Sequence, residues 1–441
     1  MNKMLRVTQL STTDTIGGAA VAAKRLHHEL IEQGVASTMY VAQAMTQEKG
    51  IVEFKVAKHA PRKLNRFIYR AARRLQPRSK FPSGGLFTGA WTTLGNIPLW
   101  GLPSADIYHL HWISGFFDFR SLPELARRAP IVWTFHDMNA FTGGCHYDQY
   151  NDIKCGRFTA ECGMCPFLNE EKGIDDLTHK TIQRKARVLS RVPKSRLVVV
   201  SPSEWLAGEV RRSSLFGNFV TRVIPNGIDL DVFKPVDRAA IRARLGFAPD
   251  DRVVLFVAEN LNDGRKGCRQ TLEALAPLMD IPRLRILTLG KAGNTEQMSG
   301  PQYRHVGSLH DPQAIRDVYN AADLFIITSL QDNFPNTVVE ALACGTPVVG
   351  FATGGVVDAV DHGVCGLLSP TGDVAGLSDH LRTILNDDER RNAMRSVARN
   401  RAETYYGVAR QAQAYRALYE EMLSGDIGLD PKTSAPLARQ R

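Results

Sequence analysis

The chain has 441 residues, of which 44% are hydrophobic and 23% are charged. This length exceeds one ordinary core, and the composition is that of a globular protein, so we expect two or three domains. No apolar run approaches the roughly 18 residues of a membrane-spanning helix, and the N-terminus lacks the apolar stretch of a secretory signal, which together predict a cytoplasmic protein. The net charge of +10 and the pI near 9.3 suit an anionic partner, either nucleic acid, acidic lipid or a phosphate-bearing small molecule.

Strand-like runs alternate with helix-length segments along most of the chain. In the first half they cover residues 5–10, 106–111, 131–135, 196–201 and 221–226. In the second half they cover residues 253–258, 285–290, 303–307, 323–328 and 347–351. This alternation is typical of parallel sheets with crossover helices. We therefore predict two α/β domains that join near residues 230–240, followed by a helix at 409–423.

A glycine pair follows the first predicted strand. Gly17 and Gly18 precede an Ala-rich helix start, where backbone N–H groups and the helix N-terminus can hold an anion. A plain strand-to-helix turn explains the pair equally well.

Residues 62–80, RKLNRFIYRAARRLQPRSK, form a basic segment with helical periodicity. The apolar stripe is Leu64, Ile68, Ala71 and Leu75, and the basic stripe is Arg62, Arg66, Arg70 and Arg73. Such a basic amphipathic helix suits an acidic membrane surface. A helix that packs on its domain with a solvated charged face is the alternative.

Four cysteines fall in an expected insertion at 138–170, which follows the strand at 131–135. They are Cys145, Cys155, Cys162 and Cys165. In a cytoplasmic protein such a group favours metal over disulfides, and four thiolates can close a structural zinc site. Unligated thiols are the alternative, and a catalytic zinc is disfavoured because four Cys ligands leave no open position.

In the second half, Arg265 and Lys266 lie on a glycine-flanked loop after the strand at 253–258. Two adjacent cations there can neutralise a diphosphate, although a solvated turn is also possible.

Two carboxylates flank a Phe-Pro-Asn-Thr corner further along, in the sequence SLQDNFPNTVVEALACGTPVVGF at 329–351. The strand at 323–328 places Asp332 at the carboxyl edge of the sheet, where ligands of open α/β sheets bind. Glu340 falls on the short helix that follows. Because Thr337 precedes Glu340 by three residues, a capping box is an alternative explanation for this Glu.

The segment 332–351 resembles the E-x7-E motif of family-4 retaining glycosyltransferases, with Asp332 in the place of the first Glu. The Gly-Gly loop, the segment PNGIDLDVFKP at 225–235 and the Arg-Lys-Gly loop fall in the order of that family, including its colanic-acid and exopolysaccharide enzymes. The resemblance implies an α/β chain of GT-B fold: two facing Rossmann-like domains with a C-terminal crossover helix. The implied ranges are 1–232 on the acceptor side, 233–405 for the nucleotide sugar, 406–424 for the crossover helix, and 425–441 as a tail expected to be disordered.

Carried over residue by residue, the resemblance makes Glu340 the partner of the donor ribose and Arg265 and Lys266 the diphosphate clamp. Asp332 and His136 would be the catalytic pair at the transferred sugar. The remaining implied donor-binding residues are Gly17, Gly18, Phe334, Pro335 and Asn336. Since the two cations would stabilise the leaving diphosphate, no catalytic metal is expected, and Asp229 and Asp231 in PNGIDLDVF are interpreted as structural.

The sequence thus predicts a retaining, metal-independent glycosyltransferase. It would move a hexose from a UDP- or GDP-sugar to a lipid-linked saccharide acceptor during cell-surface polysaccharide synthesis. The enzyme would bind peripherally to the inner face of the cell membrane. A nucleotide-sugar epimerase on the same fold is one alternative. A basic nucleic-acid-binding protein is another, but the chain has no recognised reading helix and its positive charge is concentrated in one segment, so no nucleic-acid partner is expected.

Overall fold

The computed structural model describes residues 4–56, 61–74, 86–150, 153–168, 173–291 and 300–426. The chain forms two compact units: unit 1 is Met1–Pro225 together with Ala409–Arg441, and unit 2 is Asn226–Val408. Unit 2 begins before the expected residue 233 because Ile228 and Phe233 are buried in its core. Most of the expected tail at 425–441 lies outside the described residues.

Unit 1 is built on a seven-stranded sheet with the order β3-β2-β1-β4-β5-β8-β9, in which every pairing is parallel. The strands are β1 (Arg6–Thr13), β2 (Ala36–Gln43), β3 (Ile51–Glu53), β4 (Ile107–Leu110), β5 (Ile131–Thr134), β8 (Leu197–Ser201) and β9 (Thr221–Val223). A separate hairpin joins β6 (Gln149–Tyr150) to β7 (Ile153–Lys154). The central strands are buried on both faces, as parallel sheets require.

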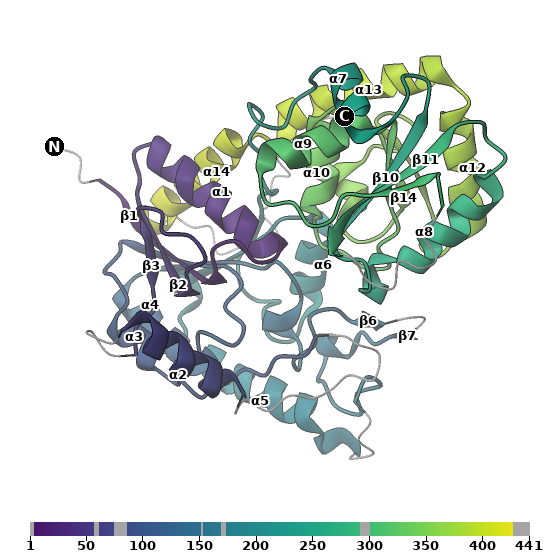
Figure 1. Ribbon diagram of the computed structural model, residues 1–441. Coiled ribbons are helices and arrows are strands. Elements are labelled where there is room, and N and C mark those ends of the chain that lie inside the picture. Colours follow the sequence, from purple (N-terminus) through teal and green to yellow (C-terminus); the bar gives the residue numbers. More distant parts are fainter. Residues whose placement is uncertain are drawn as a thin grey trace. The chain divides into compact units, whose positions relative to one another are not determined.

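Helices cover both faces of the unit 1 sheet. They are α1 (Gly18–Glu32), α2 (Arg62–Arg74), α3 (Ile97–Trp100), α4 (Leu122–Arg128), α5 (Leu177–Leu189), α6 (Glu204–Arg212) and α14 (Val408–Ser424). On one face, side chains of α1 and α14 share a core with β1, β4, β5 and β8, and Figure 1 shows these two helices side by side although they come from opposite ends of the chain. The other face carries an aromatic-rich core that includes Trp133, Phe135 and Phe141.

The C-terminal helix α14 is tied to the unit 1 sheet by two buried tyrosines. The Tyr415 hydroxyl lies 2.8 Å from Thr134 Oγ1, and the Tyr419 hydroxyl lies 2.7 Å from His109 Nδ1. Both hydroxyls therefore have the partners that burial demands. The expected crossover helix is confirmed.

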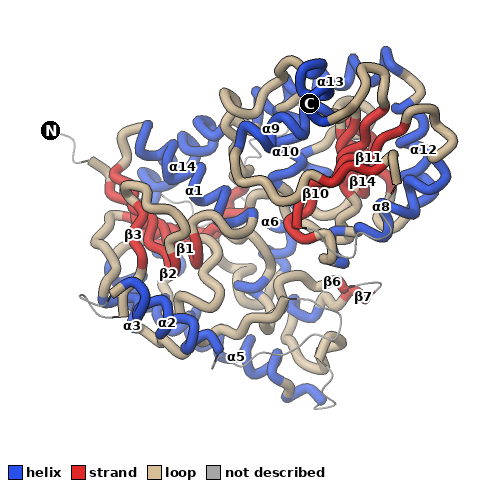
Figure 2. Tube along the Cα trace, in the orientation of Figure 1, coloured by secondary structure: helices blue, strands red, loops and turns tan. Residues whose placement is uncertain are grey.

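Unit 2 has a six-stranded parallel sheet with the order β12-β11-β10-β13-β14-β15, flanked by helices on both faces (Figure 2). Its strands are β10 (Arg252–Asn260), β11 (Leu284–Lys291), β12 (Tyr303–His305), β13 (Leu324–Ile327), β14 (Val348–Phe351) and β15 (Gly366–Ser369). Its helices are α7 (Arg238–Leu245), α8 (Cys268–Leu275), α9 (Pro312–Ala321), α10 (Asn336–Ala343), α11 (Val356–Ala359), α12 (Val374–Leu385) and α13 (Asp388–Tyr405). Alternate residues of β10 face two different cores, one with α9, α10 and α13 and one with α8 and α12.

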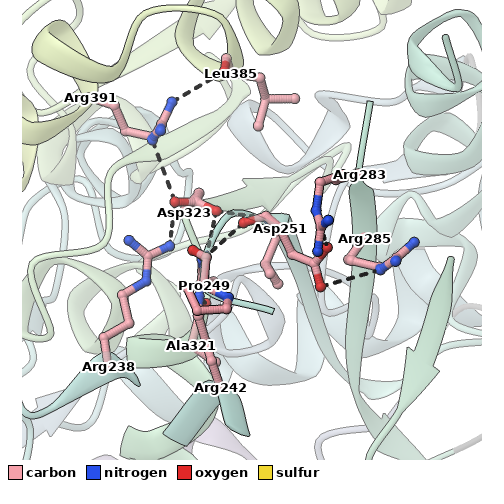
Figure 3. A network of polar contacts seen from close by, with 12 residues as sticks. Arg238, Arg242, Pro249, Asp251, Arg283, Arg285, Ala321, Asp323, Leu385 and Arg391 are labelled. Carbon is pink, nitrogen blue, oxygen red and sulfur yellow. Dashed lines mark hydrogen bonds and ion pairs between the residues drawn. The ribbon is translucent and has the colours of Figure 1, made fainter. Parts of the chain in front are cut away.

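The buried carboxylate of Asp323 holds several elements together at the amino edge of this sheet, the edge where the strands begin (Figure 3). It pairs with Arg238, with Arg242 at 2.6 Å and with Arg391 at 3.4 Å, and it accepts the Val253 backbone N–H at 2.7 Å. Burial raises the pKa of Asp323, but Arg238 and Arg242 outweigh this and hold it below its ordinary value. One side chain thus joins β13, β10, α7 and α13.

Among the described residues, no helix combines the length and the apolar character needed to span a bilayer.

We expect Asp323→Asn to lower the free energy of unfolding by about 3 kcal/mol, because it leaves buried arginines without their counter-charge. Urea denaturation would measure the loss. The matched control is Asp280→Asn, whose exposed ion pair with Arg382 should contribute little. Equal effects of the two substitutions would contradict the role given to Asp323.

Candidate active site

In unit 2, two loops that follow adjacent strands are held together as one structure. The Arg-Lys-Gly loop follows β10, and residues 328–335 follow β13, which pairs with β10. Leu330 N donates to Arg265 O at 2.8 Å, and Thr328 Oγ1 donates to Gly267 O at 2.8 Å. Gly267 has φ of +72°, and a Cβ there would stand 2.0 Å from Thr328 O, so the approach requires glycine.

This arrangement brings three of the predicted site residues into contact. Lys266 Nζ lies 2.5 Å from Asp332 Oδ2, and Arg265 Nη1 lies 3.5 Å from the same oxygen. Asn333 N donates to Asp332 Oδ1 at 3.0 Å. Burial raises the pKa of Asp332, but Lys266 and Arg265 outweigh it and keep the pKa below its ordinary value. Asp332 is therefore a carboxylate at neutral pH and can accept hydrogen bonds but not donate a proton.

A second glycine fixes the backbone of Asp332. Gly354 has φ of +50°, and a Cβ there would stand 1.8 Å from Asp332 O. Gly355 N donates to Asp332 O at 3.1 Å. The loop after β14 thus supports the Asp332 loop from the other side.

Glu340 lies on α10, is buried, and accepts a hydrogen bond of 3.0 Å from the Tyr319 hydroxyl. The capping-box alternative is wrong. The helix begins at Asn336, its N-cap is Pro335, and no side chain caps it. Because proline has no N–H, the reciprocal bond of a capping box cannot form.

Asn226 is a site residue that the sequence alone did not reveal. Its Nδ2 donates to Asn336 Oδ1 at 3.1 Å and lies 3.5 Å from Phe334 O, so it holds the Phe-Pro-Asn corner. Phe334 itself is buried against Tyr406, with ring centroids 5.6 Å apart. The Pro-Asn-Gly turn at 225–227 was the available signal, but its partner lies more than a hundred residues away.

The Asp229 side chain is hydrogen-bonded within its own segment. Its Oδ1 accepts the backbone N–H groups of Asp231 and Val232 at 2.9 and 3.1 Å.

In unit 1, the glycine pair follows β1 and precedes α1, as predicted, which places it at the carboxyl edge of the sheet. Gly17 has φ of +86° and is the N-cap of α1, and Gly18 is the first helical residue. The nearby Asp14 carboxylate accepts the backbone N–H groups of Met45 and Thr46 at 2.7 and 2.8 Å, which joins this loop to the one after β2.

His136 follows β5 at the same edge and belongs to a chain of polar side chains. His136 Nε2 lies 3.2 Å from His111 Nδ1, His111 Nε2 lies 2.9 Å from Gln9 Oε1, and Gln9 Nε2 donates to Ser37 Oγ at 3.1 Å. Because Gln9 Oε1 can only accept, His111 carries its proton on Nε2, and His136 donates from Nε2 to His111 Nδ1. Burial lowers the pKa of His136 to about 4, so the ring is neutral at pH 7.

The residue after His136 anchors the cysteine-rich insertion. Asp137 Oδ2 lies 2.6 Å from His146 Nδ1 and accepts from Trp112 Nε1 at 2.8 Å. Burial raises the pKa of Asp137, but His146 and the hydrogen bonds outweigh it and lower the pKa. Trp112, His136 and Asp137 all line a small pocket of about 30 Å³.

The four cysteines of the insertion are free thiols in one neighbourhood. Cys145, Cys155 and Cys165 pack against Phe87, Tyr150 and Phe167, and Gly143 N donates to Cys162 Sγ at 3.2 Å. Burial raises the pKa of Cys162 to about 12 and of Cys165 to about 11, and neighbouring thiols add to both shifts. Within the described ranges, no three His, Cys, Asp or Glu side chains are grouped so as to hold a metal. As arranged, the thiols do not fit a zinc ion, and the zinc site stays a prediction.

The basic helix exists as α2, but the expected stripes face differently. Arg62 and Arg66 turn toward the domain and pair with Glu53 at 3.1 and 3.2 Å. The buried side chains are Asn65 and Tyr69 rather than the Leu64 stripe, because a polar side chain here satisfies backbone groups of residues 54 and 56. The outward side carries Leu64 and Phe67, which are 49% and 69% exposed. Leu75 and the rest of the segment to residue 80 lie outside the described residues.

Two family models match adjoining parts of this chain. The model described as Glycosyltransferase Family 4 matches residues 16–232, and that described as Glycosyl transferases group 1 matches residues 237–401. The chain belongs to the family-4 glycosyltransferases. Both units thus contain a segment that one of these models matches.

Curated relatives of this chain include a D-inositol 3-phosphate glycosyltransferase of Corynebacterium jeikeium, 33% identical over an alignment of 219 residues that covers 46% of this chain and 52% of that protein. The chain thus spans about half the length of that relative. WcaC of Escherichia coli K12, named for colanic acid biosynthesis, is 25% identical over 78% of this chain and 82% of its own.

Solved structures confirm the expected GT-B fold. Sucrose-phosphate synthase from Thermosynechococcus elongatus has a TM-score of 0.65 at 17% identity and covers 95% of this chain and 99% of its own. Anabaena HepE in complex with UDP and glucose has a TM-score of 0.63 at 16% identity and covers 94% of this chain and 99% of its own. At these identities the likeness shows the fold alone.

The zinc hypothesis predicts that the reduced protein binds stoichiometric zinc, measured by elemental analysis after zinc loading and desalting. Cys162→Ser should abolish retention, because it removes one of four ligands. Cys268→Ser, at an isolated cysteine of unit 2, is the matched control. If the wild-type protein retains no zinc, the thiols are unligated.

Proposed function

We propose that this glycosyltransferase moves a hexose from a UDP- or GDP-sugar to a saccharide acceptor with retention of configuration and without a catalytic metal. The observation that carries the proposal is the cluster of Arg265, Lys266 and ionised Asp332 at the carboxyl edge of the unit 2 sheet. It combines two cations with a carboxylate at the position where α/β sheets bind ligands. The complex of HepE with UDP and glucose supports a nucleotide-sugar donor.

Charge assigns roles within this cluster. Loss of a nucleoside diphosphate leaves negative charge on the phosphates, which Arg265 and Lys266 can stabilise without a metal. The N-terminal end of α10 begins at Asn336 in the same corner and adds a positive dipole end. Because Asp332 is ionised, it would accept hydrogen bonds from the hydroxyls of the transferred sugar and balance its developing positive charge.

Glu340 and Tyr319 would form the ribose-binding end of the donor site. Glu340 is held by the Tyr319 hydroxyl, so one carboxylate oxygen already has a fixed position. In unit 1, Gly17 and Gly18 would contact the distal phosphate, and neutral His136, oriented by His111, would contact the sugar. A neutral ring suits this role because it adds no charge beside the oxocarbenium-like sugar.

The saccharide acceptor would be lipid-linked, and the pathway would be that of a cell-surface polysaccharide. The likeness to WcaC supports this assignment. The exposed Leu64 and Phe67 of α2, flanked by exposed Lys63 and Arg70, support peripheral binding to an anionic membrane.

Site variants test the donor assignment. Glu340→Gln should weaken donor binding at least tenfold, measured by thermal shift across UDP-, GDP-, ADP- and TDP-sugars. Asp332→Asn should lower kcat at least tenfold with a smaller effect on donor affinity. Glu273→Gln, an exposed acid on α8, is the matched control.

The proposal fails if no nucleotide sugar stabilises the wild-type protein, or if Glu340→Gln binds donor normally. Product NMR with EDTA present would check the anomer and metal independence.

Flotation with liposomes tests the membrane assignment. The protein should float with anionic vesicles at low salt, and the double substitution Leu64→Ser and Phe67→Ser should reduce the bound fraction severalfold. The matched substitution Val397→Ser, at an exposed apolar residue of α13 in unit 2, should have no effect. Absence of flotation by the wild-type protein would remove the membrane assignment.

A further inference from the structure

A basic groove of about 920 Å³ lies on unit 1. Part of its wall is the end of α4, just before β5 begins, and the short helix Lys194–Arg196, just before β8 begins. Because β4, β5 and β8 are parallel, these segments lie at the amino edge of the sheet. His136 and the glycine pair lie at the carboxyl edge, so the groove is a separate site. We call it the arginine groove.

Arginine dominates the lining of this groove. It contains Arg120, Arg127, Arg128, Arg191 and Arg196, whereas Glu124 is the one acidic residue among the lining side chains, all of which belong to the described part of the chain. Glu124 is already shared between Arg127 and Arg128. The groove therefore has an excess of positive charge that favours an anion.

Several of these guanidinium groups are fixed in place. Arg196 Nε donates to Ala126 O at 3.0 Å, and Arg128 Nη1 donates to Leu99 O at 3.0 Å. Arg120 binds the buried Asp118 carboxylate through two bonds of 2.9 Å. Asp118 thus occupies the fork of Arg120, and the arginines that remain for a ligand's carboxylates are Arg127, Arg128, Arg191 and Arg196. Because Arg128 and Arg196 are already held, they lose little entropy when they bind a carboxylate.

An exposed aromatic ring completes the groove. Trp100, at the end of α3, also lines it and is 77% exposed. Because the flat face of an indole packs well against the C–H face of a sugar ring, Trp100 adds a saccharide-binding element to a carboxylate-binding surface.

We propose that the arginine groove binds an acidic saccharide chain, one whose sugars carry carboxylates. The proposal rests on the proposed transfer of sugar to a saccharide. Charge complementarity and the single stacking ring favour this ligand over single-stranded nucleic acid, which requires several stacking rings along a basic channel. The concave shape favours a chain over a flat bilayer. A chain bound here would lie at the opposite edge of the unit 1 sheet from His136.

The test measures binding of oligogalacturonate by calorimetry, without any donor. Wild-type protein should bind it, and the double substitution Arg127→Glu and Arg191→Glu should weaken binding at least tenfold. Trp100→Ala should weaken it severalfold. Arg269→Glu, at a 77% exposed arginine on α8 of unit 2, is the matched control and should have no effect. Unfolding midpoints equal to that of the wild type would show that the variants are folded.

Three results would overturn the proposal: no binding by the wild type, equal binding of neutral maltooligosaccharide, or binding only of DNA or anionic vesicles. The donor-induced thermal shift of the double variant separates this proposal from the proposed function. A normal shift with lost oligogalacturonate binding supports both. Oligogalacturonate binding without any donor-induced shift would leave the groove in place and remove the transferase assignment.

Discussion

Parallel pairing of strands is the constraint on which both units depend. In each of the two large sheets all strands run the same way, so residues that follow a strand lie at one edge and residues that precede it lie at the other. Gly17, His111 and His136 reach the carboxyl edge of unit 1 in this manner, and Lys266 and Asp332 reach that of unit 2. Residues distant in sequence become neighbours because their strands are neighbours.

The two edges of the unit 2 sheet show how similar chemistry serves different ends. Asp323 and Asp332 flank the same strand, β13, and both are buried carboxylates with basic partners. Asp323 has three arginines from two helices, α7 and α13, and a backbone N–H, so its charge is compensated and it holds these elements together. Asp332 and its two cations instead lie on loops that close in on each other through Gly267 and Gly354. An arriving phosphate could share Lys266 with Asp332, whereas no ligand chemistry is needed to explain Asp323.

Sequence patterns predicted the strands with continuous apolar runs, such as β5 and β13, because two buried faces require such runs. They missed β2, whose sequence ASTMYVAQ mixes polar residues with apolar ones. They also predicted the wrong buried face for α2, because Asn65 is buried in place of Leu64 and forms hydrogen bonds with backbone groups. The candidate site was predictable where a motif is local, as at 332–340. The Lys266–Asp332 pair, the Tyr319 partner of Glu340 and the Asn226 contact depend on side chains far apart in sequence, which periodicity does not address.

Helix α14 has a consequence for how the chain is made. Unit 1 is composed of the first 225 residues and a helix that the ribosome synthesises after all of unit 2. Until residues 415–422 emerge, the β-sheet face of unit 1 lacks the side chains that complete its core, and His109 and Thr134 lack their tyrosine partners. An apolar face of unit 1 therefore stays exposed to aggregation while unit 2 is synthesised and folds. Truncation near the C-terminus would destabilise unit 1, although unit 1 is synthesised first.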